Sequence, residues 1–277
     1  MARAMPRSWA KRALALLAVA GIAAQVTAEA QVAQQGPWPS RPFAERPKNV
    51  PGEFDYYTLV LSWSPTHCAT TERGKDDTQC ARDDGIRYGF VLHGLWPQYE
   101  KGYPERCYTR WKPFVPQQVI NEVSDVMPSR GLIIHEYRQH GTCSGLRPQP
   151  YFALAEQIYR RINIPKRYRN PFETQVVSPR DVIGDFLQAN PELRPDMIAV
   201  TCGGAGDRLL DVRICVTRQG RPRPCGVNEQ QGRLCRAGRV RLPPVRATAW
   251  DYEHDRLREP KRKNLPQPRI YQVPVGR

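Results

Sequence analysis

Runs of apolar residues predict β-strands in four segments of this chain. Residues 54–63 are aromatic and β-branched enough to predict a strand, and residues 88–93 predict a second strand that ends near a histidine. Residues 197–202 and 209–217 predict two more. The strands and helices do not repeat as βαβ units, so the strands are expected to pair mainly in an antiparallel sheet.

Helical spacing of apolar residues marks three other segments. Residues 116–127 and 151–162 repeat apolar positions three and four apart. A third helix is expected to begin at Ser178, because Pro179 and Asp181 follow it as a start signal, and to end at Asn190. Together these patterns predict an α+β fold, a single domain with a mainly antiparallel sheet flanked by helices.

The two ends of the chain differ from this domain. Residues 1–28 run from basic residues through an apolar stretch at 13–24 to small residues, which is the order of a secretory signal peptide. The apolar stretch is 12 residues long, too short for a membrane-spanning helix. We expect a Pro-rich linker at 29–52, the folded domain at 53–245 and a basic flexible tail at 246–277. The protein is therefore expected to be exported, periplasmic or extracellular, with no membrane segment in the mature form.

Basic residues are in excess over the whole chain. The formal net charge is +15, and removal of residues 1–28, which hold four basic and no acidic residues, lowers it to +11. A field of this sign attracts polyanions such as nucleic acid and speeds their encounter. Many basic proteins bind nucleic acid only incidentally, and a solvated tail without a specific role is the preferred interpretation of the basic C-terminal end.

All eight cysteines fall inside the predicted mature chain. An exported protein with an even number of cysteines is expected to pair them, and eight cysteines allow 105 connectivities. Zinc ribbons are the alternative, but the chain has no closely spaced C-x-x-C pair to form them. The cysteine pattern therefore favours disulfides and leaves their connectivity open.

Two short segments about forty residues apart concentrate the candidate chemistry. Gly89 to Pro97 reads GFVLHGLWP, and His135 to Cys143 reads HEYRQHGTC. Together they contain three of the five histidines and one carboxylate in otherwise apolar, aromatic surroundings: His93, His135, Glu136 and His140. The ordinary pKa of histidine is roughly 6.5, so two histidines can act as the base and the acid of one displacement.

A zinc site is the first alternative, because His135 and Glu136 followed by a second histidine resemble the motif H-E-x-x-H. That motif needs histidines four apart, whereas His135 and His140 are five apart, about 140° around a helix axis. Glu136 and His140 share one helix face instead, as do His135 and Gln139. The carboxylate can then orient the His140 imidazole, which suits acid-base chemistry better than ligation. We expect no metal and no cofactor.

The two segments, in this order and with these flanks, resemble the two active-site blocks of the ribonuclease T2 family, secreted endoribonucleases that cleave RNA without a metal. The first block matches at Phe90, His93, Gly94, Leu95, Trp96 and Pro97, and the second at His135, Glu136, His140, Gly141, Thr142 and Cys143. The likeness extends from about Glu53 to Cys235. It implies the family's α+β fold.

The resemblance also implies a reaction on single-stranded RNA. The ribose 2'-hydroxyl would attack its own 3'-phosphate, giving a 2',3'-cyclic phosphate that is hydrolysed to a 3'-phosphate end. By carry-over, His140 is the base and His93 the acid, with the reverse assignment left open. His135 would hold the phosphate, and Glu136 would orient and polarise. The resemblance selects one cysteine pairing, Cys68 with Cys80, Cys107 with Cys143, Cys202 with Cys235, and Cys215 with Cys225.

Two positions of the second block depart from the family pattern. Tyr137 stands where the family usually has tryptophan. Gln139 stands where it usually has a lysine, which is thought to stabilise the negative charge of the transition state. Arg138 is adjacent but points about 100° away on a helix, so it replaces the lysine only if the backbone departs from helical geometry. The change is expected to affect the rate more than the reaction type.

Aromatic residues near the first block are candidates to stack on unpaired RNA bases. Trp96 is the first choice, and Tyr99 and Tyr103 are the next, with core packing as an equal alternative for each. Gln98 and Ser62 depart from base-selecting residues that some family members share. We therefore expect broad base specificity.

Two other functions stay open at this point. An RNA-binding or cytotoxic T2-like protein with weak residual activity would follow if Gln139 disables the site, although the retained histidines and Glu136 argue against it. A metal-dependent nuclease is the other, and its sensitivity to EDTA would distinguish it. The expected partner is single-stranded RNA, with no obligate protein partner.

Overall fold

The computed structural model describes residues 49–70, 78–80, 86–203 and 207–245. The predicted signal peptide and basic tail lie outside these residues, as does the predicted linker up to residue 48. The last linker residues form a turn, in which the backbone N–H of Gly52 donates to the carbonyl oxygen of Cys143 (2.9 Å). Within the described ranges, no helix combines the length and the apolar character needed to cross a membrane.

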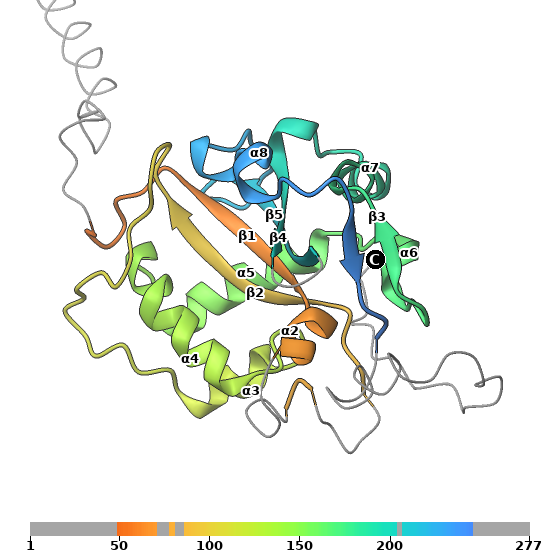
Figure 1. Ribbon diagram of the computed structural model, residues 1–277. Coiled ribbons are helices and arrows are strands. Elements are labelled where there is room, and N and C mark those ends of the chain that lie inside the picture. Colours follow the sequence, from red (N-terminus) through yellow and green to blue (C-terminus); the bar gives the residue numbers. More distant parts are fainter. Residues whose placement is uncertain (1–48, 71–77, 81–85, 204–206, 246–277) are drawn as a thin grey trace, which may run out of the picture. The chain divides into compact units, whose positions relative to one another are not determined.

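The fold is α+β, built on a six-stranded sheet in the order β2-β1-β5-β6-β3, with β4 also paired to β5 (Figure 1). The strands are β1 (Tyr56–Trp63), β2 (Phe90–Gln98), β3 (Gln175–Val177), β4 (Ile198–Gly203), β5 (Arg208–Val216) and β6 (Val240–Leu242). All pairs are antiparallel except β5 with β6, which meet in parallel. The predicted fold class is confirmed.

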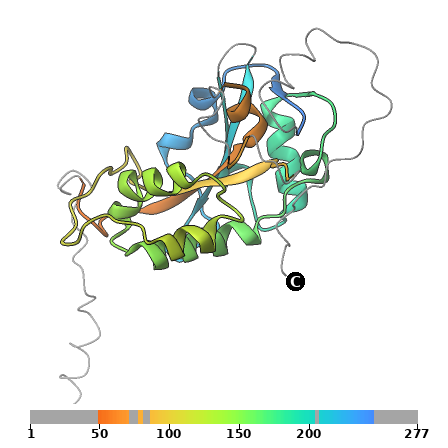
Figure 2. The same ribbon diagram turned by 90° about the horizontal axis from the view of Figure 1, so that it is seen from below.

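Short helices connect and cover the strands. They are α2 (Ser64–Thr70), α3 (Gln117–Val123), α4 (Arg130–Gln139), α5 (Pro148–Arg161), α6 (Lys166–Arg169), α7 (Pro179–Ala189) and α8 (Gln231–Leu234), with 3-10 turns η1 (Gly141–Ser144), η2 (Pro195–Met197) and η3 (Val227–Glu229). α5 packs against β1 and β2, α3 against α5, and α4 against β2. Figure 2 shows the yellow-green and green helices beside the orange and yellow strands β1 and β2.

The helix-covered face of the sheet is apolar. Leu59 and Leu61 of β1 pair with Leu95 and Leu92 of β2, and all four are fully buried in one core. Successive residues of a strand point to opposite faces, so Ser62 points away from this core. The second face receives polar side chains from β1, β2 and β5, and the candidate site is built on it.

The longer elements lie where the sequence predicts them. The strands expected at 54–63, 197–202 and 209–217 are β1, β4 and β5, and the helix expected at 151–162 is α5. The helix expected after Ser178 is α7. The Ser178 hydroxyl accepts from the N–H of Asp181 and the Asp181 carboxylate accepts from the N–H of Ser178, both at 3.0 Å, which is a capping box.

Two predicted elements have different lengths. The helix expected at 116–127 ends at Val123, and β2, expected to end at His93, continues to Gln98. β2 can continue through Pro97 because it is an edge strand, where a residue without an N–H is tolerated. Elements of three or four residues, such as β3 and α6, are too short to show a period.

Four disulfides close loops in the domain: Cys68–Cys80, Cys107–Cys143, Cys202–Cys235 and Cys215–Cys225. They are the same four pairs that the resemblance implies. Cys107–Cys143 joins positions 36 residues apart, the segment after β2 and the turn after α4. Chain entropy gives a crosslink of this span about 4 kcal/mol of stabilisation. The bridge therefore helps to hold the two sequence blocks at one place.

Candidate active site

His93 lies in a β-bulge of β2. The register with β1 skips one residue between Leu92 and Gly94, so His93 is the extra residue. A bulge re-aims the side chain it contains and shifts the alternation beyond it. Without the bulge, His93 and Trp96, three residues apart, would point to opposite faces of the sheet. With it, their rings meet edge to face at 5.4 Å.

A chain of hydrogen bonds holds the inner nitrogen of His93. The hydroxyl of Ser62 on β1 donates to Oδ1 of Asp211 on β5 (2.5 Å) and lies 2.6 Å from Nδ1 of His93. Because that hydroxyl proton is directed at Asp211, the Ser62 oxygen accepts from the N–H at Nδ1. The hydroxyl of Thr201 donates to the other oxygen of Asp211 (3.0 Å). The ring of His93 is thereby fixed with Nε2 on the side of Glu136.

Glu136 is a buried carboxylate that connects the two sequence blocks. It lies on α4 and is 1 % exposed. Its Oε2 accepts from the indole N–H of Trp96 (2.6 Å), and its Oε1 is 3.4 Å from Nε2 of His93. A buried carboxylate is costly unless hydrogen bonds and an opposite charge compensate it. Trp96 and protonated His93 supply both.

His140 ends α4, and its ring is almost enclosed. Its backbone N–H donates to the carbonyl oxygen of Glu136 (2.9 Å), and its ring stacks on Trp96 at 4.8 Å and 23°. Nδ1 is buried and has no hydrogen-bond partner in the described part of the chain. A ring protonated at both nitrogens therefore leaves a buried N–H unsatisfied, at a cost of about 1–3 kcal/mol. The environment favours the neutral imidazole.

The two imidazoles have opposite pKa shifts. At His140, burial prevails over the attraction of Glu136 and lowers the pKa to about 4. At His93, burial also acts to lower the pKa, but the hydrogen bonds and charges of Asp211 and Glu136 outweigh it and raise the pKa to about 10. Near neutral pH, His93 therefore holds a proton that His140 lacks. The His93 side chain is 30 % exposed, which leaves this proton accessible.

His135 and Gln139 lie outside the hydrogen bonds of this cluster. Both line a groove between α4 and residues 106–113, and His135 is exposed. The Gln139 amide nitrogen donates to Glu105 (2.5 Å), and its oxygen accepts from Nε of Arg106 (2.7 Å). The shared face expected for these two residues is confirmed. The position of the family's lysine thus holds an amide that is itself bonded to a cation.

Tyr137 is the other residue of the second block that departs from the family pattern, and it lies in the core. Tyr137 is fully buried, and its hydroxyl donates to the carbonyl oxygen of Leu146 (2.9 Å) and accepts from the indole of Trp111 (3.1 Å). α4 stays helical through Gln139. The backbone distortion that would turn Arg138 into the lysine's position is therefore not present.

The predicted base-binding residues differ in exposure. Trp96 is half-buried, and its ring packs on His140. Tyr99 is half-buried and packs against the hydrophobic core, whereas Tyr103 is 55 % exposed. Gln98 is buried. Stacking of RNA bases on these aromatic rings stays a prediction.

The sequence analysis missed the contribution of β5. Its register with β1 places Asp211 opposite Ser62 and Arg213 opposite Val60, so both polar side chains lie on the face of the site. The guanidinium of Arg213 lies 5.0 Å over the ring of Trp96. The available signal was the pair of charged residues two apart in the otherwise mainly apolar segment LLDVRICV. Ser62, considered only for base selection, contacts the candidate acid instead.

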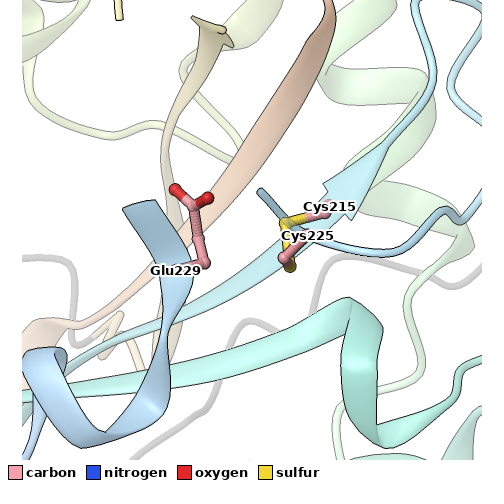
Figure 3. Close-up of side chains that lie close together, drawn as sticks. All are labelled: Cys215, Cys225 and Glu229. Atoms are coloured by element: carbon pink, nitrogen blue, oxygen red, sulfur yellow. A yellow bond between two sulfur atoms is a disulfide. The ribbon is translucent and has the colours of Figure 1, made fainter. Parts of the chain in front are cut away.

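Within the described residues, one further group brings together possible metal ligands. It consists of Cys215, Cys225 and Glu229, whose ligand atoms lie within 4.8 Å of one another. Figure 3 shows the two sulfur atoms bonded to each other, and a disulfide offers no thiolate to a metal. The Glu229 carboxylate accepts from the hydroxyls of Tyr56 (2.5 Å) and Thr58 (3.0 Å). This group is therefore structural.

Two histidines with oppositely shifted pKa values lie around a buried carboxylate, which makes this cluster a candidate acid-base site on an α+β fold. Residues 54–225, more than half of the chain, match the model of the Ribonuclease T2 family. A ribonuclease of Aeromonas hydrophila is 38 % identical over 188 residues, which cover 66 % of this chain and 80 % of that protein. The chain therefore belongs to the ribonuclease T2 family, and it is a ribonuclease.

More distant relatives agree with this assignment. Ribonuclease I of Escherichia coli is 25 % identical over 215 residues, covering 64 % of this chain and 80 % of that protein. Among solved structures, trichomaglin, described as an S-like ribonuclease, superposes with a TM-score of 0.55 at 20 % identity. The superposition covers 70 % of this chain and 100 % of that chain. It shows that the fold is shared.

Gly94 is where the two blocks approach most closely. An added Cβ would lie 2.1 Å from Oε2 of Glu136 and 2.6 Å from Nε1 of Trp96, the two atoms that share the buried hydrogen bond. Gly94→Ala must therefore displace the carboxylate that also faces His93. We expect RNA cleavage to fall about a hundredfold, as a misplacement of about 1 Å does in catalytic sites.

The matched control for this substitution is Gly184→Ala on α7. An added Cβ at Gly184 meets nothing within 4 Å, and this variant should keep its activity. Initial rates on single-stranded RNA, with circular dichroism to verify folding, compare the two variants. Equal activity of Gly94→Ala and Gly184→Ala would contradict the close packing between the blocks.

Proposed function

We propose that this ribonuclease cleaves single-stranded RNA by transphosphorylation. The ribose 2'-hydroxyl attacks the adjacent 3'-phosphate, which forms a 2',3'-cyclic phosphate and releases a 5'-hydroxyl, and water then opens the cycle to a 3'-phosphate. The nucleophile belongs to the substrate, so the protein needs only a base, an acid and charge stabilisation. The packing of the His93 and His140 rings on Trp96, at 5.4 and 4.8 Å, carries this proposal.

His140 is the base of the first step, and His93 is the acid. His140 is neutral and accepts the proton of the 2'-hydroxyl, while His93 is protonated and gives its proton to the departing 5'-oxygen. A bound phosphate adds negative charge, which raises the pKa of His140 toward the operating pH. In the hydrolysis step the two residues exchange roles.

The neighbouring side chains position His93, the acid. Asp211 and Ser62 hold Nδ1 of His93, so that the transferable proton is at Nε2. Glu136 holds the other side of the ring and fixes Trp96, on which His140 packs. His135, by the family pattern, contacts the phosphate. Arg213 adds positive charge beside Trp96, which favours the more negative transition state.

Substrate range and location complete the proposal. Single-stranded RNA fits because unpaired bases are free to stack on aromatic side chains, and Tyr103 is the most exposed of the three candidates. Broad base specificity rests on the departure at Gln98, since Ser62 contacts His93 and Asp211. Export to the periplasm or the medium is supported by four disulfides, which persist in oxidising compartments.

Cleavage should require the 2'-hydroxyl and be unaffected by chelators, because the ribose provides the nucleophile and the two histidines provide the proton transfers. RNA and a DNA of matched sequence, each with and without EDTA, are incubated and resolved on a gel. We expect cleavage of RNA alone, at the same rate with EDTA. Mass spectrometry of early products should find 2',3'-cyclic phosphate ends.

The alternatives predict different results in the same experiment. Cleavage of DNA or inhibition by EDTA would indicate a metal-dependent nuclease. Retention of RNA without cleavage would indicate a T2-like protein that binds RNA and has only residual activity.

A further inference from the structure

A groove of about 810 Å³ runs along the outer face of α4. One wall is residues 106–113, which lie between β2 and α3 (Figure 1), and the other is α4 from Gly131 to Gln139, continuing to Thr142. Its volume is in the range of pockets that enclose a whole small ligand.

The loop wall of the groove is fixed to the helix wall. The disulfide Cys107–Cys143 joins the two, and the backbone N–H of Arg106 donates to the carbonyl oxygen of Gln139 (2.8 Å). A groove with anchored walls needs little ordering when a ligand binds.

The groove concentrates positive charge without a carboxylate in its lining. Its exposed basic residues are Arg106, Arg110, Lys112 and Arg138. Arg106 bonds to Gln139, while Arg110, Lys112 and Arg138 take part in no ion pair in the described part of the chain. Four cations gathered in one concavity repel one another and attract an anion.

Outside the groove, ion pairs neutralise four arginines: Arg160 with Glu156, Arg167 with Asp185, Arg194 with Asp196 and Arg223 with Glu100. Other exposed arginines of the described residues, such as Arg161, Arg180 and Arg233, are in no ion pair either. What distinguishes the groove is that its unpaired cations line a single concavity.

The groove lies close to the candidate base in the chain. His135 and Gln139 line it, and His140, the candidate base, directly follows Gln139 at the end of α4. Tyr108 also lines the groove and is 88 % exposed, which offers a ring on which a base can stack. Cations that can hold phosphates and an exposed ring that can stack on a base are together what a nucleic-acid strand requires of a binding site.

We propose that this groove is a second binding site for the RNA strand, one that holds phosphates beyond the scissile one. The inference rests on the proposed function and adds a substrate preference to it. A polynucleotide reaches from the catalytic pair into the groove, whereas a dinucleoside monophosphate has no phosphate left to place there. The enzyme is therefore selective for polymeric RNA over its shortest substrates.

The test compares two triple variants with equal loss of charge. The first is Arg110→Gln, Lys112→Gln and Arg138→Gln in the groove. The control is Arg161→Gln, Arg180→Gln and Arg233→Gln, three exposed positions that do not line the groove. Cleavage rates are measured on a long single-stranded RNA and on a dinucleoside monophosphate, and affinity is measured with a 2'-O-methylated oligonucleotide, which lacks the nucleophile.

The groove variant should bind the oligonucleotide at least about tenfold more weakly than the control variant at low salt. The slope of log affinity against log salt should fall by about two, since each phosphate contact on a single strand contributes about 0.7. Cleavage of the dinucleoside monophosphate should be unchanged, which also shows that the variant is folded.

Other outcomes overturn the inference. Equal losses in the two variants would attribute the effect to net charge, and undiminished affinity would leave the groove without a role in RNA binding. A parallel loss on the dinucleoside monophosphate would mean that these residues act through the catalytic pair. If wild-type protein cleaves neither substrate, the proposed function itself fails, and this result is distinct from all of the others.

Discussion

Replacing His93 or His140 with alanine is expected to lower the turnover of RNA by more than about a hundredfold, with the fold retained. Each residue is assigned one of the two proton transfers. His93 is bonded through Ser62 to Asp211 and faces Glu136 on its other side, while His140 is packed on Trp96. The loss should fall mainly on kcat, because neither ring is the principal phosphate contact.

His67, an exposed histidine on α2, provides the matched control, and His67→Ala should retain its activity. The double variant of His93 and His140 should lose little more than the worse single variant, since residues that act as a unit are strongly non-additive. Single-turnover rates on polymeric RNA measure all four proteins. Near wild-type activity of either single variant would refute the assignment of the acid-base pair.

The dependence of kcat/KM on pH should distinguish the effects of the two carboxylates, Asp211 and Glu136, on the pKa values of His93 and His140. In the wild-type enzyme the rate rises with pH as the base, His140, loses its proton near its pKa of about 4. It falls as the acid, His93, loses its proton near its pKa of about 10. Asp211 and Glu136 both raise the pKa of His93, whereas at His140 Glu136 is the carboxylate of the site that raises it.

Asp211→Asn should therefore move the alkaline limb of the profile to lower pH and leave the acid limb in place. Glu136→Gln should move both limbs to lower pH, because both imidazoles lose a group that favours their charged form. Glu192→Gln, an exposed carboxylate on the loop after α7, should change neither limb. An alkaline limb that stays in place in Asp211→Asn would mean that His93 is not the acid of the rate-determining step.

Much of the fold and the site follows from local sequence. The strand at β5 and the helices α5 and α7 have clear periods, and the cap of α7 is specified by residues three apart, Ser178 and Asp181. The turn of a helix also separates His135 from His140 and groups His135 with Gln139, as the structure has them. Such features depend on neighbours in the chain, so the sequence alone contains their cause.

Contacts between residues far apart in the chain could not be predicted from the sequence. Asp211 and Ser62 are 149 residues apart and meet because β5 pairs with β1 in one register. A shift of this register by one residue would turn both side chains to the opposite face. Arg106 and Gln139 meet in the same way, through a loop closed by a disulfide.

The sequence by itself determined which residues carry the chemistry, since His93, His135, Glu136 and His140 stand in two compact blocks. Only the tertiary structure decided the orientation of these four side chains. The bulge at His93 shifts the alternation of β2 so that the histidine and Trp96 share one face, and the burial of Glu136 beneath them depends on how α4 packs against that strand. Bulges, registers and helix packing are set by the sum of contacts between distant segments, which no local period encodes.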